Sequence, residues 1–137
     1  MTLPVTAALA AALAALLLLL AVDTVRNRFR TQQAFGMGDD DKLTRASRAH
    51  GNLAEHAPIV IIMVALLEMS RANHMGLMVV AGVFIVARVL HALGLYMDPP
   101  AQGSPPWPRA VGVTLTWLVI AALGAWTALM LLGNLGS

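Results

Sequence analysis

Four long apolar runs divide this sequence, and they constrain its fold more than any other feature. The first, Leu3 to Val22, is almost purely Ala, Leu and Val, and its length is close to the roughly 20 residues that a helix needs to cross the hydrocarbon of a bilayer. Hydrophobic residues make up 58% of the chain and charged residues only 12%, which lies outside the range of soluble domains. The sequence therefore predicts an all-α integral membrane protein.

The 137 residues have room for one domain, which we expect to be a bundle of four transmembrane helices. The connections are polar or proline-rich: Thr31 to Lys42 contains three consecutive aspartates, and Pro99 to Pro108 contains five prolines. A shorter turn, Arg71 to His74, joins the second and third runs. The expected spans are residues 3–25, 43–70, 75–97 and 109–133.

Basic residues predict the orientation of these spans. No Lys or Arg precedes the first apolar run, so we interpret this run as a retained span and not as a signal peptide. The second connection holds only Arg71, whereas the first and third hold most of the basic residues. Those residues are Arg26, Arg28, Arg30, Lys42, Arg45, Arg48 and Arg109. Both termini should therefore face away from the cytosol, and the high Ala, Leu and Arg content indicates a bacterial inner membrane.

Several classes of site have little support in the sequence. The chain has no cysteine, so a disulfide or a thiolate metal site is impossible and any reactive sulfur must come from a ligand. The four histidines form no His-x-x-x-His pair, and we predict no metal site. The basic residues are not interleaved with aromatic residues, which argues against nucleic acid as a partner.

A stripe of polar residues precedes the apolar part of the second span. On a helix, Arg45, Arg48, Asn52, Glu55 and His56 fall within an arc of about 100°. Because a carboxylate near hydrocarbon is costly unless it is paired or faces a wet cavity, we expect this stripe to point into the bundle. The alternative is a buried ion pair between Arg48 and Glu55 that only fixes the register of the helices.

The third span carries two further polar residues, Arg88 and His91, one turn apart. An arginine more than halfway along a transmembrane helix is rare and indicates a functional site. Its expected protein partner is Glu55. Alone, His91 would be a packing histidine, but beside Arg88 it becomes a candidate ligand donor.

The second-span segment resembles the signature of the MAPEG family, the membrane-associated proteins in eicosanoid and glutathione metabolism. The pattern is Arg-Ala-x-x-Asn-x-x-Glu-x-x-Pro, matched at Arg48, Ala49, Asn52, Glu55 and Pro58. A second match is the Arg-x-x-His segment of the third span, followed by a proline-rich loop that ends in Arg109. His50 is most similar to the histidine of microsomal glutathione transferases.

This resemblance implies a homotrimer that binds glutathione between subunits, toward the cytosolic side. Arg48, Arg88 and His50 would bind carboxylates of glutathione, Asn52 its amides and Glu55 its ammonium. The complete set implied for glutathione binding is Arg48, His50, Asn52, Glu55, Arg88, His91 and Arg28, the last at the cytosolic end of the first span. Tyr96 is displaced by one residue from a tyrosine of the family, which puts its role in doubt.

The resemblance implies a catalytic role for Arg109, which occupies the place of a thiolate-stabilising arginine in transferase members. The alternative is that Arg109 only anchors the topology. The expected function is that of a glutathione transferase or peroxidase acting on lipophilic electrophiles or lipid hydroperoxides. Two alternatives stay open: a non-catalytic member that binds glutathione or lipid and acts through partners, and a small channel or carrier.

Overall fold

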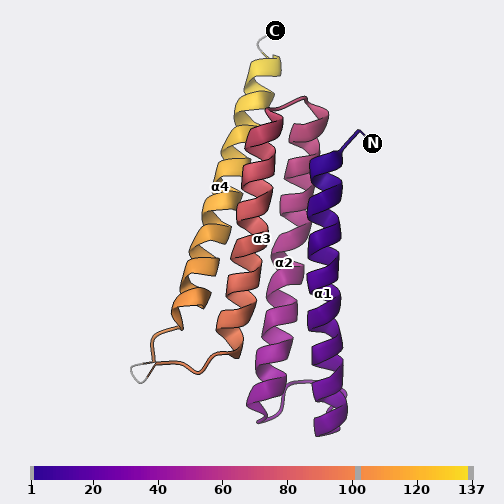
Figure 1. The fold of residues 1–137 in the computed structure, drawn as a ribbon, viewed down its shortest axis with the longest axis vertical. Coiled ribbons are helices and arrows are strands. Elements are labelled where there is room, and N and C mark those ends of the chain that lie inside the picture. The colour runs from indigo at the N-terminus through magenta and orange to yellow at the C-terminus, as the bar shows by residue number, and fades with distance from the viewer. Residues whose placement is uncertain (1, 101–102, 136–137) are drawn as a thin grey trace.

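The structure, a computed structural model, describes residues 2–100 and 103–135. Within these residues the chain forms four long helices packed side by side as a bundle (Figure 1). The helices are α1 (Pro4–Thr31), α2 (Asp41–Met69), α3 (His74–Tyr96) and α4 (Trp107–Leu135). Each contains a stretch long and apolar enough to cross a membrane, which confirms the four predicted helical spans.

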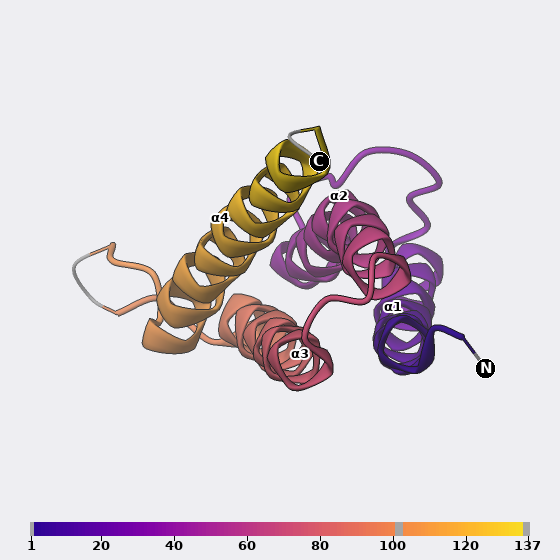
Figure 2. The ribbon, with the colours of Figure 1, turned by 90° about the horizontal axis from the view of Figure 1, so that it is seen from above.

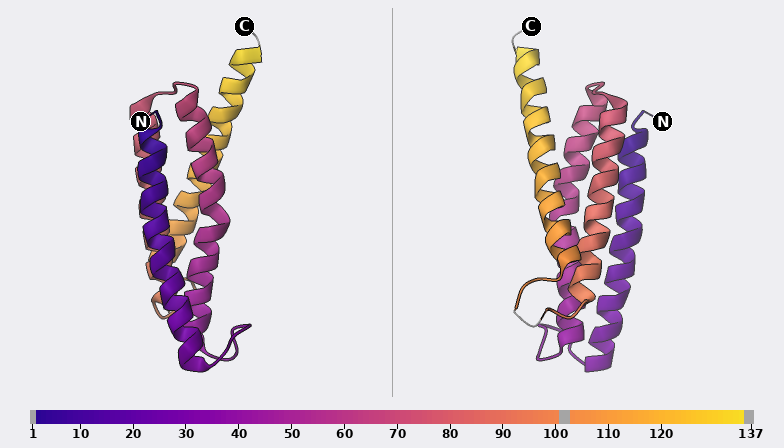
Figure 3. Two further views of the ribbon diagram at one scale, coloured as in Figure 1. Left: turned by 90° about the vertical axis from the view of Figure 1, so that its right-hand side faces the viewer. Right: turned by 60° about the vertical axis from the view of Figure 1, so that its left-hand side comes forward.

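The two ends of the bundle differ in what they contain. The start of α1, the α2–α3 turn and the end of α4 lie together at one end, which we call the N-terminal face (Figures 1 and 3). The α1–α2 and α3–α4 loops lie at the opposite end, the loop face. Because the basic residues of the first and third connections lie toward the loop face, the charge count predicts that this face is cytosolic.

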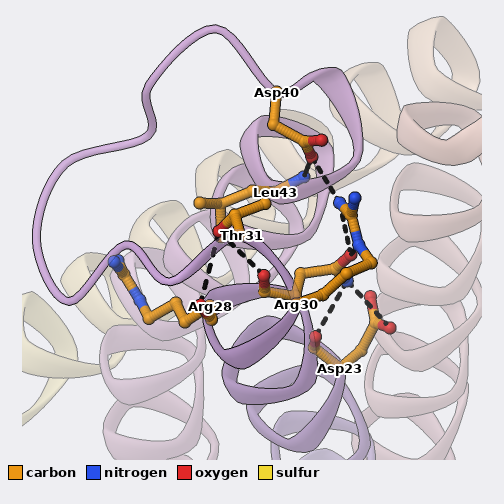
Figure 4. Close-up of polar contacts among 7 residues, drawn as sticks. Asp23, Arg28, Arg30, Thr31, Asp40 and Leu43 are labelled. Carbon is orange, nitrogen blue, oxygen red and sulfur yellow. Dashed lines mark hydrogen bonds and ion pairs between the residues drawn. The ribbon is translucent and has the colours of Figure 1, made fainter.

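Three helices extend further toward the loop face than the predicted spans: α4 begins at Trp107, two residues early, and α1 and α2 are extended as well. α1 continues to Thr31, where Gln32 adopts a left-handed conformation (φ 54°) and ends the helix. α2 already begins at Asp41, because the Asp40 carboxylate accepts a hydrogen bond of 2.7 Å from the Leu43 N–H. Arg30 also donates to Asp40 at 2.6 Å and holds the pKa of that carboxyl below its ordinary value (Figure 4). The connection predicted over Thr31 to Lys42 is therefore a loop of residues 32–40, held at Asp40 by the hydrogen bonds to Leu43 and Arg30.

Glu68, near the end of α2, fixes the start of α1. Its carboxylate accepts hydrogen bonds from the Val5 N–H, the Thr6 N–H and the Thr6 hydroxyl, all at 2.7–2.8 Å. The first N–H groups of a helix have no partner within the helix, and a carboxylate also complements the positive end of the helix dipole. Glu68 therefore ties α1 to α2 at the N-terminal face.

The core is made of aliphatic side chains from all four helices around Phe84 of α3, which is fully buried. α4 leans away from the direction of the other helices (Figure 2). Near the loop face α4 lies very close to α3, because two glycines leave room for the facing backbone. A Cβ atom at Gly94 would lie 2.3 Å from the Arg109 nitrogen, and one at Gly112 would lie 2.6 Å from the Ala87 oxygen and the His91 nitrogen.

Candidate functional site

Arg88 lies at the centre of the candidate site, in the middle of the bundle. Only 2% of its surface is exposed, and its Nη1 donates a hydrogen bond of 2.9 Å to the Asn52 side-chain oxygen. This bond joins α3 to α2, and the partner of the guanidinium is a neutral amide. The Arg88 Nε is buried and has no hydrogen-bond partner among the described residues. The site therefore holds a buried cation without a counter-ion from the described part of the chain.

A cavity of about 210 Å³ adjoins this guanidinium. Asn52 and His56 line it from α2, Arg88 from α3, and Val113, Thr116 and Trp117 from α4. The His56 Nδ1 lies 2.8 Å from the Asn52 carbonyl oxygen, which fixes its ring beside the cavity. Trp117 is 65% exposed, so the α4 side of the cavity adjoins the outer surface of the bundle.

Arg109 lies on an exposed part of α4, close to this cavity. It lines a second hollow of about 440 Å³, formed with Pro99, Pro106 and other residues of the α3–α4 loop. Val113 lines both hollows, so they are neighbours. The close approach of the Arg109 backbone to Gly94 fixes where this side chain starts.

His91 is buried next to the same helix crossing. Its exposed fraction is 5%, and its Nδ1 has no hydrogen-bond partner among the described residues. Its backbone packs against Gly112 of α4. His91 is thus a buried histidine beside the α3–α4 crossing, and it is not among the residues that line the Arg88 cavity.

Two predictions about the polar stripe of α2 were wrong. Arg48 and Glu55 are exposed on the isolated chain, so the stripe does not point into the bundle as a whole. Arg88 pairs with Asn52 and not with Glu55, and no ion pair joins Arg48 to Glu55 in the described residues.

The reason lies in how α2 is turned about its axis. Its buried face is centred on Ala46, Ala49 and Leu53, whose small or aliphatic side chains pack against the neighbouring helices. The polar stripe lies to one side of this face, so only its edge, Asn52 and His56, reaches the interior.

The remaining predicted residues lie apart from the Arg88 cavity. His50 is half-buried on a different side of α2. The Arg28 Nη1 donates to the carbonyl oxygens of Gln33, Ala34 and Gly36 at 3.1–3.3 Å and so closes the α1–α2 loop. Within one copy of the chain, the structure does not bring Arg28 or His50 together with Arg88.

Tyr96 is tied to a residue that the sequence did not single out. Its hydroxyl donates to an Asp23 carboxylate oxygen at 2.6 Å and connects α3 to α1. Arg45, the first member of the polar stripe, donates to the Tyr96 carbonyl oxygen at 3.1 Å and to Asp98 at 2.8 Å. These residues brace the loop face and do not line the Arg88 cavity.

The α4 wall of the cavity also escaped the sequence-based search. Thr116 is 1% exposed and donates to the Gly112 carbonyl oxygen at 2.7 Å, so its hydroxyl is satisfied inside the helix. In the sequence, Thr116 stands out only as a polar residue four positions after Gly112 in an apolar run. That pattern does not reveal which face of α4 meets Arg88.

Comparison with known proteins adds a family and two relatives. The sequence matches the MAPEG family over residues 6–129. It is also similar to the inner membrane protein YecN of Escherichia coli K12, with 33% identity over 129 residues, covering 93% of this chain and 88% of that protein. YecN of Escherichia coli O6:H1 (strain CFT073) matches to the same extent.

Proposed function

Because this chain belongs to the MAPEG family, we propose that it is a glutathione-dependent enzyme of the bacterial inner membrane. The proposed activity is transfer of glutathione to lipophilic electrophiles, or reduction of lipid hydroperoxides by glutathione. The observation that carries the proposal is the buried Arg88 guanidinium, which adjoins a cavity lined in part by polar side chains and has only a neutral protein partner.

Glutathione suits the charges of this site. It carries two carboxylates and one ammonium, and an arginine binds a carboxylate through charge-assisted hydrogen bonds. A buried charge without a partner is costly, so a carboxylate beside the free Arg88 Nε would compensate it. Asn52, His56 and the unpaired nitrogen of His91 would supply further polar contacts.

The exposed signature residues support binding between copies of the chain. Arg48 and Glu55 lie on a membrane-spanning helix, and both are exposed on the isolated chain. A charged side chain facing lipid is costly, and cover by a second copy or a ligand would remove that cost. In the proposed homotrimer, Glu55 meets the ammonium of glutathione, Arg48 and His50 meet a carboxylate, and Arg28 contributes from a neighbouring subunit.

Arg109 has the proposed catalytic role. An ordinary thiol, with a pKa near 8.5, is mostly protonated at neutral pH, whereas the thiolate is the nucleophile. A guanidinium beside the sulfur stabilises the thiolate. In the transferase reaction, the sulfur bonds to the electrophilic carbon and the leaving group departs with its electron pair. In the peroxidase reaction, two glutathione molecules become a disulfide while the hydroperoxide yields an alcohol and water.

Exposed Trp117 beside the cavity offers a route for a lipophilic substrate from the bilayer. With the loop face in the cytosol, glutathione reaches the same site from the aqueous side. The site is thus proposed to lie toward the cytosol, where a soluble thiol and a membrane-borne electrophile can meet.

The experiment is an assay of thiol conjugation and of hydroperoxide reduction in detergent, with Arg109→Ala compared to wild type. The control is Lys42→Ala, which removes an exposed positive charge near the same face. Loss of one preorganised charge-stabilising group costs about a hundredfold in turnover, so Arg109→Ala should lose activity to this extent and Lys42→Ala should not. Wild-type activity in Arg109→Ala would remove Arg109 from the mechanism, and glutathione binding without any turnover in the wild type would favour the non-catalytic alternative.

A further inference from the structure

A second candidate binding site lies at the N-terminal face, at the opposite end of the bundle from Arg109. It is a groove of about 330 Å³ between residues 4–9 of α1 and residues 74–85 of α3. The groove is lined by aliphatic side chains, proline, methionine and Gly82, with His74 as its one ionisable lining residue. The groove is therefore apolar along its length and polar at one end.

The groove runs along the axes of α1 and α3. His74 is the first residue of α3 and Ile85 lies about three turns further along it, so the α3 side runs for roughly 16 Å from the N-terminal face into the bundle. Ala8, Ala81 and Gly82 keep it open, and a Cβ atom at Gly82 would meet nothing within 4 Å. An extended hydrocarbon chain fits this direction and this lining.

The charges at the mouth of the groove define what the rest of the ligand must be. Arg71 is exposed in the turn just before α3, and its side chain has no hydrogen bond or ion pair with any described residue. His74 is also exposed and carries a ring N–H donor. The nearby carboxylate of Glu68 is already engaged by three donors of α1. His74 lines the groove, and Arg71 lies three residues before it in the same turn, outside the lining. Both side chains can donate hydrogen bonds to an external anion.

We propose that this groove binds one acyl chain of an anionic phospholipid, with Arg71 and His74 holding its phosphate. The ligand comes from the leaflet on the side of the N-terminus. The site does not depend on glutathione or on the chemistry at Arg109, because it shares no lining residue with the Arg88 cavity. It would keep a lipid between α1 and α3, beside the Glu68 contact that fixes the start of α1.

The test is titration of the delipidated, detergent-solubilised protein with phosphatidylglycerol or phosphatidylethanolamine, with bound lipid counted by native mass spectrometry. Wild type should bind phosphatidylglycerol more tightly. One basic residue near an anionic lipid contributes about a fivefold factor in affinity, so Arg71→Ala should bind phosphatidylglycerol about fivefold more weakly. Phosphatidylethanolamine, whose ammonium already balances its phosphate, should lose less, so the preference for phosphatidylglycerol should shrink.

A second pair of variants tests the groove itself. Gly82→Leu places a bulky side chain in the groove and should weaken binding of both lipids, whereas Val83→Leu, at the next residue and outside the lining, should weaken neither. Soluble glycerol 3-phosphate should not compete. The proposal is overturned if Arg71→Ala leaves the preference for phosphatidylglycerol unchanged, if Gly82→Leu binds lipid like Val83→Leu, or if glycerol 3-phosphate displaces the lipid.

Discussion

Replacement of Gly112 by alanine should separate α3 from α4 at the point where they hold the candidate site. The added Cβ would lie 2.6 Å from the Ala87 oxygen and the His91 nitrogen, whereas ordinary van der Waals contact begins at 3.4 Å, so α4 must retreat by roughly 0.8 Å. Both obstructing atoms belong to the α3 backbone and have no rotamer that moves them aside. The strain therefore falls on the helix crossing itself.

Two opposing effects set the size of the change. Gly→Ala in a helix stabilises by about 0.5–1 kcal/mol, and overpacking a well-packed interior costs about 1–3 kcal/mol. Gly124→Ala on the same helix is the matched control, because its Cβ would meet nothing within 4 Å and gains only the first effect. Gly112→Ala should therefore be less stable than Gly124→Ala by about 1–3 kcal/mol.

The same retreat should also affect activity. Arg109 lies one turn before Gly112, so it moves with α4, and a misplacement of about 1 Å at a catalytic group costs on the order of a hundredfold. Thermal unfolding in detergent, followed by circular dichroism, and the thiol conjugation assay would measure both effects. Equal unfolding temperatures and equal activities for the two variants would refute the close crossing and its role in placing Arg109.

Three further predictions concern contacts outside the cavity. Glu68→Gln should lower the free energy of unfolding by about 1.5–3 kcal/mol, because it removes the charge that α1 binds, and an unchanged unfolding temperature would contradict this. Tyr96→Phe should cost about 1 kcal/mol through loss of the hydrogen bond to Asp23, yet leave glutathione affinity intact in a calorimetric titration; a drop in that affinity would place Tyr96 in the site. The bond from Arg30 lowers the pKa of Asp40 from 3.8. The stabilisation from this ion pair is therefore fully present above pH 3.8 and is lost as the pH falls through the lowered pKa. Amide hydrogen exchange at the start of α2 should accelerate in that acid range. Exchange rates that do not change as Asp40 is protonated would argue against the ion pair.

The four spans were predictable because a long apolar run that crosses a membrane must satisfy its own backbone hydrogen bonds, and a helix does so. The ends of the helices were not, since hydropathy marks where hydrocarbon ends and not where a helix ends. α1 runs on through Arg26 to Thr31, and α2 starts early at Asp41, because backbone capping by Gln32 and Asp40 decides these points.

The candidate site was only partly accessible from the sequence. The buried Arg88 and its neighbour His91 could be singled out because polar residues are rare at such depth. The choice of Asn52 over Glu55 as partner depended on the rotation of α2, which Ala46, Ala49 and Leu53 determine by packing. The α4 wall of the cavity depends on how helices cross, and no local pattern encodes that.

Glutathione binding is the central claim, and calorimetric titration of glutathione into the detergent-purified protein tests it most directly. We expect saturable binding that Arg48→Ala and Glu55→Gln each weaken by roughly ten- to a hundredfold, the loss expected when one charge-assisted contact is removed. Lys42→Ala should bind like wild type. Absence of any binding to the wild-type protein freed of lipid, or equal affinity in all three variants, would contradict the account.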